Sequence, residues 1–262
     1  MSHKKYIDVS YWQGDIDWTK VKGEVDGVII RAGYGQNNID KKFKEYISEC
    51  NRLGIPCGVY WFSYAYTEAM ARKEAEYCLA AIKPYKVELP VCFDFEYDSV
   101  DKAKAKGVAI SKALATAMVH AFCGAVEAAG YYAMNYTNKD YLNKYFDDTT
   151  LKYDLWLAQW PNKPNLEKPP EGVGIWQYSS KGSVAGIKGD VDMDAAYKDY
   201  KAIIAKAGLN GKKKDEVKEE VKPWYSDALA WAVEKGISDG TKHNTPVTRA
   251  ELWDALYKMY GK

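Results

Sequence analysis

The stretch VCFDFEYD, residues 91–98, places two acids within an apolar, aromatic run of the kind that forms a buried strand. Side chains at positions i and i+2 of a strand point to the same face, with backbones roughly 6.6 to 6.8 Å apart, so Asp94 and Glu96 are expected to face one space. An unpaired buried carboxyl is unfavourable, and two neighbouring carboxyls raise the pKa of at least one of them. The pattern therefore indicates either a functional site or a solvated strand end with Arg or Lys partners.

This stretch belongs to the fourth of eight strand-like segments, and the early segments alternate with helical patterns. The strand-like segments are 6–10, 27–33, 57–62, 90–96, 131–136, 154–160, 173–178 and 189–193. Helical periodicity covers 41–54, 68–82 and 110–130. Such alternation predicts a parallel sheet, and eight strands predict closure into an α/β barrel of TIM-like type. Because the last three strands lack long helices between them, we expect a modified barrel.

Acidic residues recur at the ends of these predicted strands. Asp8 ends the first, Asp94 and Glu96 end the fourth, and Asp192 ends the eighth. In barrels of this type the catalytic residues lie at the C-terminal ends of the strands. We therefore expect four acids to converge at one rim, which favours a functional site over a solvated strand end.

The overall composition argues against several classes of function. The chain has 262 residues, a formal net charge of +1 and a sequence pI near 7.5, with Lys and Glu interspersed. No basic surface for nucleic acid is expected. The sequence has no H-x-x-H or HExxH motif and no phosphate-binding loop, which argues against metal and nucleotide chemistry. We therefore expect no cofactor, no metal site and no nucleic-acid partner.

The N-terminal residues and the cysteines predict the compartment of synthesis. The start, MSHKKYIDVSYW, has no apolar core segment, and no run of eighteen apolar residues occurs, so neither a signal peptide nor a membrane span is expected. The cysteines are odd in number, form no CxxC and fall in apolar segments. We expect them to be reduced core residues of a protein made in a cytoplasm. They are Cys50, Cys57, Cys78, Cys92 and Cys123.

Four stretches resemble the motifs of glycoside hydrolase family 25, the muramidases or lysozymes. They are DVSYWQGDIDW (8–18), GVYWFSYA (58–65), FDFEYD (93–98) and GIWQYSSKGSVAGIKGDVDMD (174–194). The resemblance spans about residues 4–205, in the family's order, and is closest in style to bacteriophage endolysins. It implies a barrel of eight strands and about five helices. It also implies cleavage of the β-1,4 bond between N-acetylmuramic acid and N-acetylglucosamine in bacterial peptidoglycan.

The resemblance also implies roles for the four acids. The family's general acid falls on Glu96 and its second catalytic carboxylate on Asp94, while its supporting acids fall on Asp8 and Asp192. One position departs from the family's pattern, because Trp61 stands where many members have histidine. Any role of that histidine in orienting an acid is therefore in doubt here.

Glycoside hydrolysis needs one carboxyl that protonates the leaving oxygen and a second group that stabilises or attacks the developing cation. Glu96 suits the first role if apolar neighbours raise its pKa, and Asp94 is expected to stay ionised beside it. The backbone spacing allows either retaining or inverting geometry. We favour a substrate-assisted route in which Asp94 orients the 2-acetamido group of the sugar.

The sequence contains 22 Tyr and 9 Trp residues, and several stand at predicted strand ends, where their rings could stack on sugars. Packing in the barrel wall is an equal alternative for each candidate. Arg31 is either a partner of the acid cluster or half of an ordinary barrel salt bridge. The aromatic candidates are Tyr34, Tyr60, Tyr64, Tyr136, Trp160 and Trp176.

Two rival functions remain open. A catalytically inactive carbohydrate-binding protein on the same fold would need aromatic residues but no proton donor, so the retained D-x-E pair argues against it. An amidase or peptidase that cuts the stem peptides would need zinc ligands or a Cys/His pair, and the three scattered histidines argue against both.

The C-terminal part of the sequence changes character after residue 209. Residues 210–222 form a polar, charge-mixed run that predicts a linker between a catalytic barrel, 1–209, and a small α-helical module, 223–262. The module contains two helical patterns, with an N-cap box predicted at Thr248 and Glu251. It resembles an S-layer homology repeat, especially in WAVEKGISDG and TRAEL, which implies binding to secondary cell-wall polymers. Its forty residues make a thin core, so we expect it to pack on the barrel or to form a homodimer.

As a lysin of this type, the protein is expected to be made in the host bacterial cytoplasm and to act on the cell wall after release.

Overall fold

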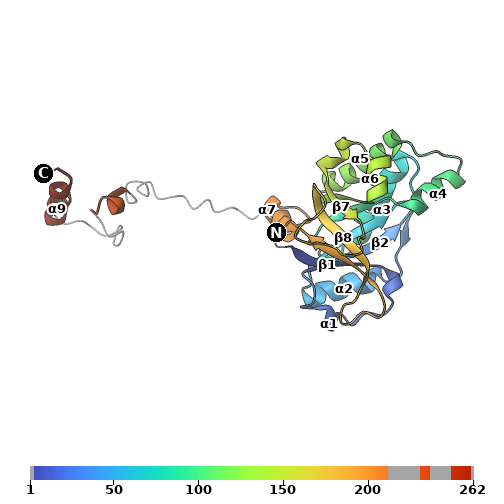
Figure 1. The fold of residues 1–262 in the computed structure, drawn as a ribbon, viewed down its shortest axis with the longest axis horizontal. Coiled ribbons are helices and arrows are strands. Elements are labelled where there is room, and N and C mark those ends of the chain that lie inside the picture. The colour runs from blue at the N-terminus through green and yellow to red at the C-terminus, as the bar shows by residue number, and fades with distance from the viewer. Residues whose placement is uncertain (1–2, 212–230, 237–248, 261–262) are drawn as a thin grey trace. The chain divides into compact units, whose positions relative to one another are not determined.

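The computed structural model describes residues 3–211, 231–236 and 249–260 (Figure 1). The chain divides into two compact units, Met1–Asp215 and Glu216–Lys262, and each is described by itself.

The first unit is a closed barrel of eight strands, as predicted. A short ninth strand, β3, pairs antiparallel with β2 outside the ring. Pairing of β1 with β2 closes the barrel. In order round the ring the strands are β1 (Lys4–Val9), β2 (Gly27–Tyr34), β4 (Cys57–Phe62), β5 (Val91–Asp94), β6 (Ala133–Asn138), β7 (Asp154–Ala158), β8 (Val173–Gly182) and β9 (Val191–Ala196), and β3 is Asn38–Ile39.

The expectation of a wholly parallel sheet is wrong at one strand. β9 runs antiparallel to both of its neighbours, β8 and β1. The connection from β8 to β9 contains no helix, and only antiparallel strands can be joined without a long crossover. Asp192 is consequently the second residue of its strand and does not end it. The reversed direction nevertheless brings it to the rim where the parallel strands end.

Helices pack around the barrel, and the three predicted ones are confirmed: α2 (Phe43–Leu53), α3 (Glu68–Ile82) and α5 (Lys112–Ala128). Four further α-helices bring the number in the described part of this unit to seven, against about five expected. Each is only four to nine residues long, too short for a clear periodic pattern. They are α1 (Trp18–Val21), α4 (Tyr97–Ala105), α6 (Lys139–Tyr145) and α7 (Tyr200–Ala207), and 3₁₀ turns cover η1 (Tyr11–Gln13) and η2 (Asp148–Lys152).

Alternating side chains of the strands divide the core into two layers. In β4, Val59 and Trp61 pack outward among the helices, whereas Tyr60 belongs to the cluster inside the barrel. The inner cluster includes Tyr6 and is completed by Tyr200 of α7. All five cysteines are free and buried. No helix among the described residues is long and apolar enough to cross a bilayer.

Asn210, the first residue of the predicted linker, is held against the barrel. Asn210 is buried, its carboxamide accepts from Tyr132 N at 2.8 Å, and it donates to Leu89 O at 3.0 Å. These bonds make Asn210 part of the barrel rather than of a linker. The remaining linker positions from 212 onward lie outside the described residues.

In the second unit, residues 231–234 are helical and α9 spans Arg249–Tyr260. The N-cap predicted on Thr248 falls outside the described part of the chain, and so does most of the first predicted helix.

Candidate active site

All four predicted acids line one pocket at the rim where the parallel strands end. Asp8 lies in β1, Asp94 ends β5 and Glu96 follows it, and Asp192 lies near the start of β9. The barrel brings these positions to one rim. The lining residues are Asp8, Ser10, Trp12, Gln13, Arg31, Tyr60, Phe62, Asp94, Glu96, Tyr136, Trp156, Trp160, Gln177 and Asp192.

Asp94 and Glu96 face this pocket from two different elements. Asp94 is the last residue of β5, whereas Glu96 is the N-cap residue of α4, with an extended backbone at φ −134° and ψ −167°. The prediction that Glu96 belongs to the strand is therefore wrong. The alternation of side chains still continues through it, because Phe93 and Phe95 stack on the opposite face with ring centroids 6.2 Å apart.

The surroundings of the two carboxyls favour protonation. Burial raises the pKa of Asp94 well above its usual value, Glu96 raises it further, and Arg31 lowers it. Burial also raises the pKa of Glu96, the hydroxyl of Tyr136 lowers it, and Asp98 raises it. The expectation that Asp94 stays ionised is therefore opposed by its own burial, and we expect the pair to hold at least one proton near neutral pH.

A second carboxyl pair, which the sequence analysis missed, lies deeper in the barrel. Asp194 is fully buried and accepts from Trp156 Nε1 at 2.7 Å. It lies close enough to Asp8 for each carboxyl to act on the pKa of the other. Burial and the charge of Asp192 raise the pKa of Asp194 to about 8, and burial raises that of Asp8 well above its usual range. The spacing of DVDMD, with acids at 192 and 194, was the available signal, because it repeats the i, i+2 spacing of the first pair.

Asp192 lies above this pair and is partly exposed. It stands directly opposite Asp8 in the register of β1 and β9. Burial, followed by the charges of Glu96 and Asp190, raises the pKa of Asp192 to about 6. The charge of Glu96 therefore acts on Asp192 across the pocket.

Gln177, also missed from the sequence, connects the buried acids to the rim. Its Nε2 donates to Asp8 Oδ2 at 2.8 Å, and its Oε1 lies 3.2 Å from both the hydroxyl of Tyr136 and Nε1 of Trp160. A fully enclosed amide in an otherwise apolar strand was the signal for it. The amide fixes the orientation of an acid, a phenol and an indole at once.

Arg31 fits both interpretations that the sequence left open. Its Nε forms a salt bridge with Asp40 at 2.8 Å, and both side chains are largely buried. The guanidinium also lies over the rings of Tyr11 and Tyr34, at 5.0 and 5.7 Å, and its charge acts on Asp94. Arg31 is therefore a barrel salt bridge that also borders the acid pocket.

The aromatic candidates separate into three groups. Tyr60, Tyr136 and Trp160 line the acid pocket. Tyr34 and Tyr64 line an adjoining pocket. Trp176 does neither.

Trp176 is 4% exposed and packs with Leu155 and Leu157 in the wall, where its Nε1 donates to Gln159 O at 2.8 Å. Of the two alternatives that the sequence left open for Trp176, this position fits packing in the barrel wall.

Trp61, the departure from the family's pattern, is also directed away from the acids. It is fully buried in the outer layer, and its Nε1 donates to Gly35 O at 3.0 Å. The side chain at this position is turned toward the helices, and it does not line the acid pocket.

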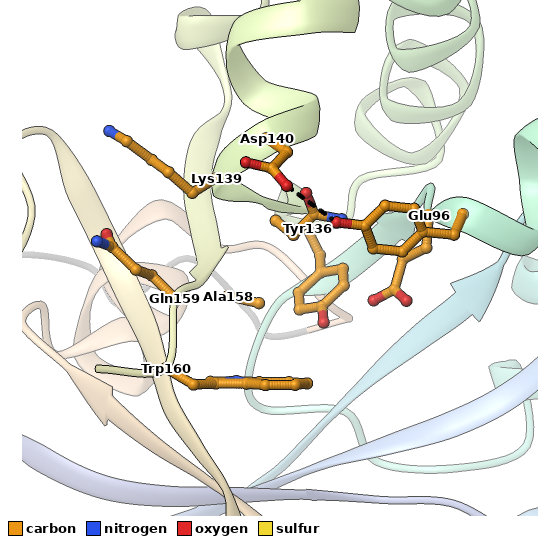
Figure 2. A pocket seen from close by; sticks show the side chains of 9 residues that line it. Glu96, Tyr136, Lys139, Asp140, Ala158, Gln159 and Trp160 are labelled. Carbon is orange, nitrogen blue, oxygen red and sulfur yellow. Dashed lines mark hydrogen bonds between the residues drawn. The ribbon is translucent and has the colours of Figure 1, made fainter. Parts of the chain in front are cut away.

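Pockets on both sides adjoin the acids and share lining residues with the acid pocket. One shares Trp12, Arg31 and Phe62 with it and adds Tyr11, Tyr34, Tyr64 and Asp98. The other shares Glu96, Tyr136 and Trp160 and adds Tyr97, Asn138, Lys139, Asp140, Ala158 and Gln159. Figure 2 shows the carboxyl of Glu96, the phenol of Tyr136 and the indole of Trp160 turned toward the same space. The three pockets adjoin one another through these shared residues, and together we call them the groove.

Within the described residues, no group of three or more His, Cys, Asp or Glu side chains is arranged to hold a metal ion.

Curated relatives and solved structures resemble this chain over its first unit. The autolytic lysozyme of Clostridium acetobutylicum is 26% identical over 195 residues, covering 72% of this chain and 55% of that protein. Lysozyme M1 of Streptomyces globisporus is 26% identical over 200 residues, covering 71% and 65%. The modular autolysin LytC of Streptococcus pneumoniae superposes with a TM-score of 0.66 at 34% identity, over 74% of this chain and 47% of LytC.

A family 25 glycosyl hydrolase from Bacillus anthracis, 23% identical, shares the fold with a TM-score of 0.63 over 77% of this chain and 92% of its own. The chain spans about half to two thirds of the length of the two curated relatives. The family model described as "Glycosyl hydrolases family 25" matches residues 7–187, which include Asp8, Asp94 and Glu96 but not Asp192. This chain belongs to glycosyl hydrolase family 25.

Proposed function

We propose that this protein is a peptidoglycan hydrolase of the muramidase type, which cleaves the β-1,4 bond between N-acetylmuramic acid and N-acetylglucosamine. The observation that carries this proposal is the pair Asp94 and Glu96, two buried carboxyls with raised pKa values that line the groove. Pockets that adjoin the acids through two different sets of residues suit an extended glycan cut within the chain. The related LytC has been solved in complex with a synthetic peptidoglycan ligand, which supports this class of substrate.

In this reaction Glu96 donates its proton to the glycosidic oxygen, since burial raises its pKa and its carboxyl faces the groove. Asp94 is the partner carboxylate. Within the described residues no donor bonds Asp94 Oδ1, which is a buried oxygen. We assign to Asp94 the role of orienting the 2-acetamido group of the sugar for attack on the anomeric carbon.

The positions of Glu96 and Asp94 indicate in which direction the glycan lies along the groove. The acid must contact the leaving oxygen, and Glu96, but not Asp94, borders the pocket that contains Tyr97, Asp140 and Trp160. We assign the leaving sugar to that pocket. The sugar whose bond is broken then lies over Asp94, and the glycan continues toward Tyr34 and Tyr64.

The test is the chemical identity of the fragments released from purified walls. Mass spectrometry is expected to find N-acetylmuramic acid at the new reducing ends. N-acetylglucosamine ends or free stem peptides would contradict the proposed bond.

A Glu96→Gln variant should lose activity by a factor on the order of 10² to 10⁴ with its thermal unfolding unchanged, because the amide cannot donate the proton. Asp101→Asn, at an exposed position of the same helix, is the matched control and should remain active. The rival function, an inactive wall-carbohydrate-binding protein, predicts wall binding by the unchanged chain with no fall in turbidity of a wall suspension.

We also propose that residues 223–262 are an S-layer-homology-like module that binds secondary wall polymers, and that the whole protein acts as a lysin of bacteriophage type on the wall after release. A catalytic barrel followed by a separate compact unit supports this arrangement. The tie between Asn210 and the barrel means that the unit should be separated after Gly211 rather than at 209.

A chain ending at Gly211 is expected to cut soluble wall fragments but to lose binding to intact walls. A fluorescent reporter fused to residues 212–262 should accumulate on walls beyond the reporter alone. Sedimentation of the full chain, compared with the shorter one, tests whether the module also forms a homodimer. Full lysis by the shorter chain together with no accumulation of the reporter would contradict the targeting role.

A further inference from the structure

Glu74 is a buried carboxylate that the proposed reaction does not use. It lies on α3 and is fully buried. Three neutral groups donate to it: Ser63 Oγ at 2.6 Å, Tyr64 N at 3.0 Å and Gln36 Nε2 at 3.3 Å. Burial raises the pKa of Glu74 to about 7, against the effect of these three bonds. A buried carboxyl by itself opposes folding. The groups that are hydrogen-bonded to Glu74 therefore indicate its role.

The bonds to Glu74 hold residues 63–65, directly after β4, against the end of β5. Ser63 N donates to Asp94 O at 2.8 Å, and the Ser63 hydroxyl, while it donates to Glu74, accepts from Ala65 N at 3.1 Å. The backbone of Asp94 is therefore tied to the same residue that Glu74 holds.

The polar contacts continue from Ser63 to the general acid. The hydroxyl of Ser99 donates to Ser63 O at 2.6 Å and accepts from Glu96 N at 3.0 Å. Ser63 and Ser99 are both fully buried. Since Glu96 is the N-cap residue of α4, this hydroxyl fixes the backbone from which its side chain extends. A continuous set of buried polar groups thus joins Glu74 to Glu96.

We propose that Glu74 is a positioning residue for the general acid: through Ser63 and Ser99 it fixes the backbone of Glu96 and so the direction of the catalytic carboxyl. This inference rests on the role of Glu96 proposed above. It has a clear physical basis, because a displacement of about 1 Å in a catalytic group can lower a rate by about 10²-fold.

The first test compares Glu74→Gln with Glu76→Gln. Glutamine keeps the shape of Glu74 but replaces one acceptor oxygen by an NH₂ group, so if Tyr64 N keeps its acceptor, Ser63 can no longer donate to residue 74. The Ser63 hydroxyl must then either accept instead or lose this bond. We expect kcat to fall by about 10-fold or more while KM stays unchanged. Glu76 lies two residues further on the same helix, is exposed and pairs with Lys73 at 2.6 Å. Its variant should retain the kcat of the unchanged protein.

A double-mutant cycle with Ser99→Ala separates positioning from plain stabilisation. If Glu74 acts through Ser99, the two substitutions together lower kcat by clearly less than the product of their single effects. If Glu74 only stabilises the fold, Glu74→Gln lowers the melting temperature with kcat unchanged, and that result would overturn the proposal. The proposal would also be overturned if the double variant lowered kcat by the full product of the two single effects, because the two residues would then act independently.

Hydrogen exchange gives a readout that does not depend on activity. Glu74→Gln is expected to speed amide exchange in residues 63–67 and also in residues 94–100, whereas Glu76→Gln changes neither. Unchanged exchange in residues 94–100 would refute the connection even in a fully active enzyme. A failure of the unchanged protein to cut peptidoglycan would instead refute the proposed function and leave this measurement readable. If Glu74→Gln does not fold, Ser63→Ala, which deletes the linking hydroxyl, takes its place in the same comparisons.

Discussion

The hydroxyl of Tyr136 donates to Oε1 of Gln177 at 3.2 Å, and the same hydroxyl lowers the pKa of Glu96. A phenol that turns its proton to Glu96 favours the ionised carboxylate and opposes the effect of burial. Tyr136 therefore adjusts the acidity of the proposed proton donor.

Replacing Tyr136 by Phe should move the alkaline limb of the kcat/KM profile to higher pH. The hydroxyl lowers the pKa of Glu96, so its loss raises that pKa, and a general acid works only while it is protonated. Rates measured from pH 4 to pH 9 test this. Tyr178→Phe, a phenol deletion outside the three pockets of the groove, should leave the limb in place, and a limb that moves to lower pH in Tyr136→Phe would contradict the assignment.

Asp94→Asn should make the protein less active and more stable. The lost charge matters most as positive charge develops on the sugar, so we expect kcat to fall on the order of 10²-fold or more with binding of soluble fragments largely kept. Burial and Glu96 raise the pKa of Asp94, so its ionised form opposes folding above the ordinary carboxyl pKa.

The melting temperature of Asp94→Asn at pH 8 should therefore exceed that of the unchanged protein. Parallel measurements of saccharide affinity, rate and unfolding check all three outcomes. If binding is lost as severely as rate, Asp94 is a binding or structural residue.

Asp194→Asn should flatten the dependence of stability on pH. The pKa of Asp194 is about 8 in the folded state, against about 3.9 in an unfolded chain. Between these values the native state keeps a proton that the unfolded chain loses. The contribution of this group is therefore complete below about pH 4 and decreases as the pH rises toward 8.

Asparagine removes this titration and can still accept from Trp156 and donate to Asp8. Denaturant unfolding at pH 5, 6, 7 and 8 measures the effect, which is at most about 1.4 kcal/mol per pH unit. Equal slopes for the variant and the unchanged protein would show that Asp194 does not hold the proton of the pair.

Trp160 and Trp176 should respond in opposite ways to truncation. Trp160 is 56% exposed and lines the groove, so Trp160→Ala should raise KM for glycan fragments by about 5-fold, corresponding to ~1 kcal/mol of aromatic contact, with little change in melting temperature. Trp176 lies in the barrel wall, so Trp176→Phe should lower the melting temperature and leave KM unchanged. A rise in KM for Trp176→Phe would return this residue to the groove.

Local patterns in the sequence determined the order of elements and the four acids. Each of the eight predicted strands overlaps a strand of the barrel, and the three long helices were predicted correctly. A longer element shows more repeats of its hydrophobic pattern, so it is easier to recognise in the sequence. Asp8, Asp94, Glu96 and Asp192 were predictable as one group, since strand ends meet at one rim of a barrel.

Tertiary structure alone decided the environment of those acids. The missing helix before the last strand was the one local signal for the reversal of β9, and nothing local indicates that Glu96 caps a helix. Asp8 and Asp194, which act on each other's pKa, are 186 positions apart, and Gln177 reaches Asp8 across 169 positions. A pKa depends on burial and on neighbours within a few ångströms, and sequence patterns report only periodicity along the chain. Trp160 and Trp176 both stand near predicted strand ends, yet Trp160 lies in the groove and Trp176 lies in the wall. The register between neighbouring strands sets the direction of each side chain, and this register is a property of the tertiary structure.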